Sequence, residues 1–142
     1  MREIKFRLWD KIENQMIYKE DYGSKDYPIL LAIGLHGLPI AIDETSFKQN
    51  EIIGWNRDHN LIPMEYTGLK DKNGKEIYES DVVEITKQCI FERGLVIFKN
   101  GCFFIKVKET LLPLYECEIN KFELKVIGNK FDNPELLEKG KE

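Results

Sequence analysis

The sequence predicts a mainly β fold with a minor α component: short hairpins, a small and partly closed barrel of the SH3-like kind, and a short C-terminal helix. Two Asn-Gly pairs, Asn73-Gly74 and Asn100-Gly101, each stand between segments rich in aliphatic and aromatic residues. Such pairs favour two-residue type I′ turns, because both central positions need a positive φ that Asn tolerates and Gly adopts freely. The clear helix signal, in contrast, is confined to the end of the chain.

The barrel is expected between residues 64 and 129, where the apolar segments are short and closely spaced. Residues 66–69 and 76–78 flank the first Asn-Gly pair, and residues 94–98 and 102–107 flank the second. The last two segments are almost continuously apolar, which indicates strands of a closed barrel or of a sheet covered on both faces. About five strands fit this stretch, and closure would leave few exposed strand edges.

The N-terminal part carries a hairpin pattern of its own. Apolar residues alternate with charged ones over residues 4–8, and residues 15–18 would return as the second strand after a polar reversal. Over residues 19–63, Gly and Pro interrupt the apolar pattern, so only short strands are expected there. We therefore predict residues 1–62 as an N-terminal β subdomain with a variable segment, and residues 63–142 as the small barrel with the terminal helix.

Three further sites carry turn or end signals. Glu79-Ser80-Asp81 should reverse the chain into the next strand, with Ser and Asp satisfying local backbone donors. Pro113 interrupts the apolar segment at residues 111–118, which suits a strand at the edge of a sheet. Asn133-Pro134 predicts a helix start, with Asn as N-cap, Pro at the first position and about two turns of helix to follow.

The composition is that of an ordinary soluble globular protein, with 42% hydrophobic and 32% charged residues. The formal net charge is −4, and the acidic pI of about 5.4 disfavours nucleic acid, whose phosphates need clustered Lys and Arg. Three cysteines and two histidines show no zinc-ligand spacing. The charged N-terminus is not a signal peptide, and the longest apolar stretch is too interrupted to span a bilayer. We therefore expect a cytoplasmic protein, with reduced thiols and no membrane contact.

Asp71, Asp81 and Glu84 are the candidates for a catalytic carboxylate cluster of a hydrolase. Turn and edge chemistry explains the same residues, because Asp commonly accepts hydrogen bonds from local backbone amides. The sequence offers no nucleophile–base pair, metal-ligand spacing or phosphate-binding loop, so no orienting partner can be named for these carboxylates. We therefore predict a protein that is not an enzyme, with no catalytic, cofactor-binding or metal-binding residues.

Two kinds of partner contact stay open. Trp9 and Trp55 are the candidate contacts to a protein partner, because aromatic residues supply much interface energy, although both would also suit a core. The candidate contacts to nucleic acid are four lysines near the two Asn-Gly turns: Lys70, Lys72, Lys75 and Lys99. They would cluster if the two hairpin tips lay side by side, although lysines at hairpin tips also keep strand edges soluble.

Three blocks of the sequence form a specific pattern. They are Met-Arg-Glu-Ile-Lys-Phe-Arg-Leu-Trp-Asp at residues 1–10, the run from Tyr-Thr-Gly-Leu-Lys-Asp to Glu-Ser-Asp-Val-Val at residues 66–83, and Val-Ile-Gly-Asn at residues 126–129 with Asn-Pro-Glu-Leu-Leu at residues 133–137. In order and spacing these blocks resemble the YopX family of phage and prophage proteins. Ser80 departs from the family pattern, which has Gly at this place. A turn there that demands a positive φ is therefore in question.

The resemblance implies a mainly β, two-part fold, an origin in a phage or prophage, and a site of action in the cytoplasm of the bacterial host. It brings no catalytic residue and no cofactor. Together with the residues above, it predicts a phage accessory protein that acts as a non-enzymatic binding or oligomeric module, through self-association or contact with a phage or host protein. The alternative is a regulatory protein associated with nucleic acid.

Overall fold

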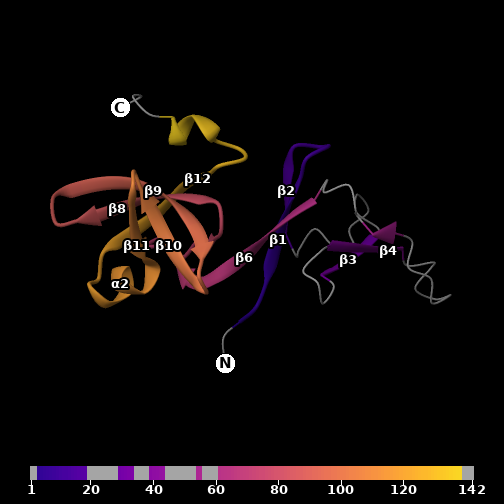
Figure 1. The fold of residues 1–142 in the computed structure, drawn as a ribbon, viewed down its shortest axis with the longest axis horizontal. Coiled ribbons are helices and arrows are strands. Elements are labelled where there is room, and N and C mark those ends of the chain that lie inside the picture. Colours follow the sequence, from indigo (N-terminus) through magenta and orange to yellow (C-terminus); the bar gives the residue numbers. More distant parts are fainter. Residues whose placement is uncertain (1–2, 19–28, 34–38, 44–53, 56–60, 139–142) are drawn as a thin grey trace. The chain divides into compact units, whose positions relative to one another are not determined.

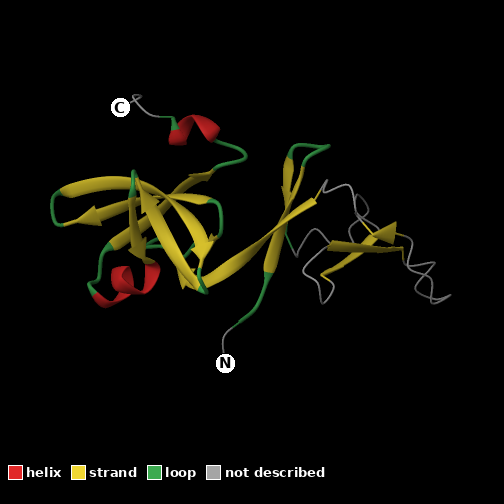
Figure 2. Ribbon diagram, viewed as in Figure 1, coloured by secondary structure: helices red, strands yellow, loops and turns green. Residues whose placement is uncertain are grey.

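The structure, a computed structural model of the chain, describes residues 3–18, 29–33, 39–43, 54–55 and 61–138. Strands dominate these residues, which confirms the predicted mainly β fold (Figure 1). One short α-helix and one 3-10 turn are the helical elements of the described part (Figure 2). No described helix is long and apolar enough to cross a membrane.

The chain divides into two compact units. The first, which we call the barrel unit, consists of Met1–Lys5 and Glu65–Glu142, and the second, the N-terminal unit, consists of Phe6–Met64. The backbone N–H of Tyr66 donates to the carbonyl oxygen of Lys5 at 2.9 Å, so the two segments of the barrel unit lie side by side. This contact is why the first residues of the chain group with its C-terminal part.

The N-terminal unit begins with an antiparallel hairpin of β1 (Phe6–Asp10) and β2 (Gln15–Ile17). The carboxylate of Asp10 ends β1, because its Oδ1 accepts the backbone N–H groups of Ile12 and Glu13 at 2.9 and 3.2 Å. This hairpin confirms the one expected from the alternating N-terminal pattern. A three-stranded sheet of the same unit has the order β3-β4-β5, with β3 at Ile29–Ile33, β4 at Pro39–Asp43 and β5 at Gly54–Trp55.

The barrel unit contains β7, the part of β6 from Glu65 onward and a five-stranded antiparallel sheet in the order β11-β10-β9-β8-β12. The sheet curls into a half-barrel, as Figure 1 shows. This agrees with the predicted partly closed barrel. The strands are β6 (Leu61–Lys70), β7 (Glu76–Tyr78), β8 (Asp81–Lys87), β9 (Ile90–Lys99), β10 (Cys102–Val107), β11 (Thr110–Pro113) and β12 (Glu123–Asn129).

The barrel unit has one hydrophobic core. Its buried members come from β7, β8, β9, β10, β12 and the helix α2, and β6 and β11 add the partly buried Leu69 and Leu112. Gly94 of β9 permits the tight curl. A Cβ at this position would collide with the side chain of Ile105 and lie 2.9 Å from the carbonyl oxygen of Lys106. The core residues are Ile77, Val83, Ile85, Val96, Ile105, Leu114, Cys117, Leu124 and Val126.

The two Asn-Gly pairs form different turns. Asn100 and Gly101 have φ values of 51° and 81° and connect the paired residues Lys99 and Cys102, which confirms the type I′ turn. At the first pair only Gly74 has a positive φ, of 82°, and residues 71–75 form a longer loop between the paired Lys70 and Glu76. The predicted type I′ turn is therefore wrong here. The side chain of Asp71 replaces it by binding backbone amides of the loop.

The segment after β10 also differs in part from the prediction. β11 is an edge strand that ends at Pro113, as expected, but residues 114–118, predicted as its continuation, belong to the helix α2 (Leu114–Ile119). Proline cannot continue the strand ladder, and the chain turns into a helix whose Leu114 and Cys117 enter the core.

The predicted C-terminal helix is a 3-10 turn, η2 (Pro134–Leu137). Its N-cap, Asn133, forms no side-chain cap hydrogen bond. Instead the Oδ1 of Asn133 accepts the backbone N–H of Asn129 at 3.3 Å, next to Gly128, where a Cβ would collide with it. The side chain that the sequence assigns to capping thus ties the turn to the end of β12.

Ser80, between β7 and β8, has a φ of 70°. Its backbone N–H donates to the carbonyl oxygen of Val96 at 2.8 Å, and its own carbonyl oxygen accepts the N–H of Lys130 at 2.9 Å. These two bonds fix the corner between three segments of the chain. The turn therefore keeps a left-handed conformation although Ser stands where Gly would fit without strain.

We predict that Ser80→Gly stabilises the protein, because Gly removes the penalty of the left-handed conformation. The gain is about 0.5–1 kcal/mol, since the greater freedom of Gly in the unfolded chain offsets part of it. Chemical denaturation of the wild type, Ser80→Gly and Ser80→Ala measures this effect. Ser80→Ala keeps the strain and should bring no gain, so equal stability of the two variants would contradict the expectation.

Candidate functional site

A clip built on Asp71 joins the β6–β7 loop to the outer edge of β12. Oδ1 of Asp71 accepts the backbone N–H groups of Asn73 and Lys75, both at 2.9 Å, and Oδ2 accepts the N–H of Val126 at 2.9 Å. Next to it, the N–H of Lys72 donates to the carbonyl oxygen of Leu124 at 2.9 Å. One buried carboxylate thus satisfies donors from two distant segments of the chain.

The ionised form of Asp71 is the stable form in this setting. Burial raises the pKa of the carboxyl group, but the N–H groups of Val126, Lys75 and Asn73 outweigh burial and hold the pKa below its ordinary value. Its side chain is therefore fully engaged as an acceptor of backbone hydrogen bonds. This is a structural role, which agrees with the turn chemistry expected for this residue.

The other two carboxylates of the predicted cluster lie on or next to β8. Asp81 is 1% exposed, and its Oδ2 accepts the backbone N–H of Tyr78 at 2.8 Å. Glu84 lies on β8 directly between Arg93 of β9 and Lys125 of β12, an arrangement that favours cross-strand charge pairs. Within the described residues, no group of three or more His, Cys, Asp or Glu side chains could hold a metal ion.

A second polar cluster ties the first residues of the chain to β6 and β7. Lys5 forms ion pairs with Glu76 and Glu3, and its Nζ lies 4.6 Å from the centre of the Tyr66 ring. The hydroxyl of Tyr78 donates to the other carboxylate oxygen of Glu76 at 2.9 Å. The hydrogen bond to Glu76 raises the pKa of Lys5, so the pair stays charged at neutral pH.

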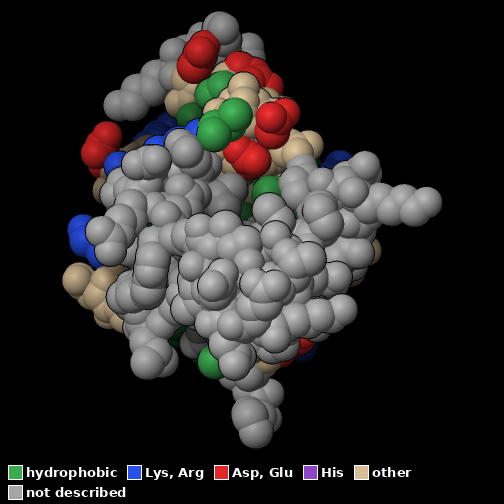
Figure 3. Space-filling view, turned by 90° about the vertical axis from the view of Figure 1, so that its right-hand side faces the viewer, with side chains coloured by type: hydrophobic (Ala, Val, Ile, Leu, Met, Phe, Trp, Pro, Cys, Tyr) green, Lys and Arg blue, Asp and Glu red, His purple; other side chains and the backbone are tan. Residues whose placement is uncertain are grey.

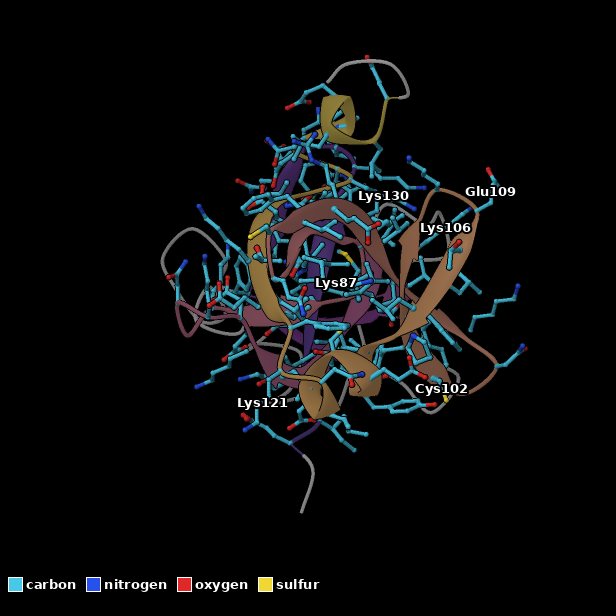
Figure 4. The ribbon with its side chains drawn as sticks, turned by 90° about the vertical axis from the view of Figure 1, so that its left-hand side faces the viewer. Lys87, Cys102, Lys106, Glu109, Lys121 and Lys130 are labelled. Atoms are coloured by element: carbon cyan, nitrogen blue, oxygen red, sulfur yellow. The ribbon has the colours of Figure 1, made fainter. Side chains whose placement is uncertain are left out.

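The four lysines proposed for nucleic acid do not form one surface. Lys70, Lys72 and Lys75 surround the loop on the outer edge of β12, whereas Lys99 lies at the β9–β10 turn, with β8 and β12 between them in the sheet order. Figure 4 shows Cys102, the pairing partner of Lys99, far from Lys121, which lines a groove with Lys70 and Lys72. The two hairpin tips are therefore not side by side, which corrects the premise of that prediction.

The described surfaces carry both signs of charge. Lys72 lies 3.7 Å from Glu123 in an exposed ion pair, and Lys87 lies 3.4 Å from Glu92. On the face in Figure 3, the described acidic side chains gather with hydrophobic ones near the top, and the described Lys and Arg side chains are scattered.

The tryptophans give no exposed anchor in the described part. Trp9 is 6% exposed, in line with the alternative of a core residue. Trp55 lies in β5, and its side chain is outside the described residues. Contact of either residue with a partner stays a prediction.

The structure adds a groove that the sequence did not indicate. It has a volume of about 430 Å³ and lies between the end of β6 with its following loop and the end of α2 with the start of β12. The sequence did not predict the side of the groove formed by α2, because residues 114–118 were predicted as strand. Leu114 and Cys117, three positions apart after a proline, are the signal of a helix that could have revealed it. The groove is lined by Gly68, Leu69, Lys70, Asp71, Lys72, Cys117, Glu118, Lys121, Phe122, Glu123 and Leu124.

Comparison with known proteins decides the family. A model of the YopX protein family matches residues 5–138. The chain belongs to the YopX family. A crystal structure of the YopX protein from Bacillus subtilis is similar, with a TM-score of 0.61 and 26% sequence identity over 97% of this chain and 100% of that one. The crystal structure of protein EF1440 from Enterococcus faecalis has a TM-score of 0.57 and 27% identity over the same shares. No curated protein matches this YopX-family chain.

We predict that Asp71→Asn destabilises the protein by about 1–3 kcal/mol, because an amide offers one acceptor oxygen and turns a donor toward backbone N–H groups. Since the folded-state pKa is lowered, the contribution of Asp71 is present above its ordinary pKa of 3.8 and is lost as the pH falls through the folded-state value. Denaturation at pH values from neutral to acid measures both effects. Glu13→Gln, at an exposed turn, removes the same charge and should leave stability nearly unchanged.

We also predict that the three cysteines differ in reactivity. Cys89 and Cys102 are exposed, whereas Cys117 is 1% exposed and burial raises its pKa to about 11. The thiolate is the reactive form, so a thiol reagent should modify Cys89 and Cys102 in the folded protein and Cys117 only after unfolding. Mass analysis of the modified peptides measures the order. Rapid modification of Cys117 in the folded state would contradict this packing.

Proposed function

We propose that this YopX-family protein is a non-enzymatic binding module of phage or prophage origin that acts in the host cytoplasm through self-association or contact with a phage or host protein. Asp71 and Asp81, two of the carboxylates considered for catalysis, accept hydrogen bonds from backbone N–H groups. This structural use of their oxygens supports the proposal.

Exposed hydrophobic side chains carry the proposal. On α2, Tyr115 and Ile119 stand one turn apart on the same side of the helix and are 55% and 72% exposed. Ile90 and Phe91, at the start of β9, are 61% and 68% exposed. These are two separate pairs of exposed apolar side chains, and binding to a partner is one way in which such side chains become covered.

The nucleic-acid alternative has weaker support. Lys72 is already paired with Glu123, and Lys99 lies apart from the other three lysines proposed for this role. The net charge of −4 also opposes approach to a polyphosphate.

Light scattering after size exclusion, combined with affinity capture from phage-infected host cells, tests the proposal. We expect a molar mass above the 16.7 kDa of one chain, or a retained partner, and the loss of either in Ile119→Glu. Ile12→Glu, at the 65% exposed Ile12 of the N-terminal unit, is the matched control and should behave as the wild type. A monomer at all concentrations, with nothing retained by the wild type that Ile119→Glu fails to retain, would overturn the proposal.

A further inference from the structure

The two Asn-Gly pairs carry a chemistry of their own. In such a pair the backbone nitrogen of the glycine can attack Cγ of the asparagine side chain, because glycine has no Cβ to hinder the approach. A bond forms between this nitrogen and Cγ, the side-chain nitrogen leaves as ammonia, and the backbone nitrogen gives up its proton. Water then opens the cyclic imide at either carbonyl group, which leaves aspartate or isoaspartate in place of the asparagine.

The Asn100-Gly101 turn is accessible to this reaction. Both residues are exposed at the tip between β9 and β10, and the paired Lys99 and Cys102 that flank them are exposed as well. Within the described part of the chain, the N–H of Gly101 donates to no carbonyl or carboxylate oxygen. The peptide between Asn100 and Gly101 has to rotate before its nitrogen can reach Cγ, and opening the end of one hairpin is enough for this rotation.

The Asn73-Gly74 pair is held by hydrogen bonds that the other pair lacks. Both of its residues are exposed, and a lysine precedes the asparagine in both pairs, so neither exposure nor local sequence separates the two. The N–H of Gly74 donates to the carbonyl oxygen of Asp71 at 3.0 Å. Oδ1 of Asp71 accepts the N–H groups of Asn73 and Lys75, both at 2.9 Å. The attacking nitrogen is thus engaged, and a buried carboxylate fixes the peptides on either side of it.

We propose that Asn100 is a site of spontaneous deamidation in the folded protein, and that the Asp71 clip protects Asn73 from the same reaction. This modification is separate from the proposed binding function and needs neither an enzyme nor a cofactor, because the reactants are the chain itself and water. Each conversion replaces a neutral amide by a carboxylate, so it adds a negative charge to the β9–β10 tip beside Lys99.

The two products affect the turn differently. Aspartate keeps the ordinary backbone and, like asparagine, accepts a left-handed conformation. Isoaspartate adds a carbon to the main chain, whereas the type I′ turn connects the paired Lys99 and Cys102 through two residues of ordinary length. The next pair along the hairpin is Phe98 and Phe103, whose ring centroids lie 5.1 Å apart in an edge-to-face contact. We therefore expect the isoaspartyl form to loosen this end of the hairpin and to unfold at a lower temperature.

Incubation of the folded protein in mildly alkaline buffer, followed by digestion at acid pH and mass analysis of the peptides, tests the proposal. We expect the Asn100 peptide to convert about tenfold faster than the Asn73 peptide, the factor for opening a hydrogen bond to a charged group. In denaturant the two should convert at nearly equal rates, because both stand in a Lys-Asn-Gly sequence. Asn100→Gly keeps a residue suited to the turn and should abolish conversion at this tip.

Asp71→Asn tests the protection of Asn73. It should speed conversion of Asn73 in the folded protein roughly fivefold or more and leave the rate at Asn100 unchanged. Glu13→Gln removes the same charge elsewhere and should change neither rate. If Asp71→Asn does not fold, the ratio of the two rates in the folded and the unfolded wild type decides. An Asn100 rate in the folded protein no higher than that of Asn73, the same ratio in both states, or an unchanged Asn73 rate in folded Asp71→Asn would each overturn the proposal.

Discussion

The architecture of the barrel unit depends on one buried carboxylate. β12 is the last strand of the curled sheet, so its outer N–H and C=O groups would face solvent as an open edge. Asp71 and the backbone of Lys72 occupy that edge at Val126 and Leu124 without adding a strand to it. The Asp71 side chain thereby satisfies an edge N–H group of β12 that a neighbouring strand would satisfy in a fully closed barrel. The groove beside α2 exists because the loop is held at this point.

The same constraint explains why the polar residues of this region do not form a catalytic site. A carboxylate that accepts three backbone hydrogen bonds has its acceptor capacity directed at the protein and its pKa lowered, so it is poorly suited to proton transfer at neutral pH. The described surface keeps large exposed apolar side chains on α2 and β9. Such side chains suit contact with another molecule better than chemistry.

Much of the fold could be predicted from local signals, and the failures have a common cause. The Asn100-Gly101 turn and the N-terminal hairpin depend on residues that are adjacent in sequence, and both are confirmed. The Asn73-Gly74 turn depends on Asp71, whose other partner, Val126, is 55 residues away, and no local pattern reveals that bond. Residues 114–118 become helical because Leu114 and Cys117 reach the core, which again is decided by tertiary contacts.

The site could be predicted less well than the fold, for the same reason. The carboxylates, lysines and tryptophans singled out in the sequence were judged one by one. A groove, in contrast, is formed by segments that are distant in the sequence and meet only in the fold. Lys121 illustrates the difference. The N–H of Phe122 donates to the carbonyl oxygen of Cys117 and the N–H of Lys121 to that of Glu118, so α2 ends with Lys121 in the left-handed conformation that glycine prefers. Ser80 is a second such position, where the residue that departs from the family pattern has a left-handed conformation.

Hydrogen exchange at the backbone amide of Val126 tests the central claim most directly. This amide points away from the sheet toward Asp71, so its protection reports on the clip alone. We predict that at neutral pH its opening free energy approaches that of the central β8 and β9 amides, and that protection declines in acid ahead of theirs as Asp71 becomes protonated. Exchange of Val126 at neutral pH as fast as an exposed edge amide would contradict the role assigned to Asp71.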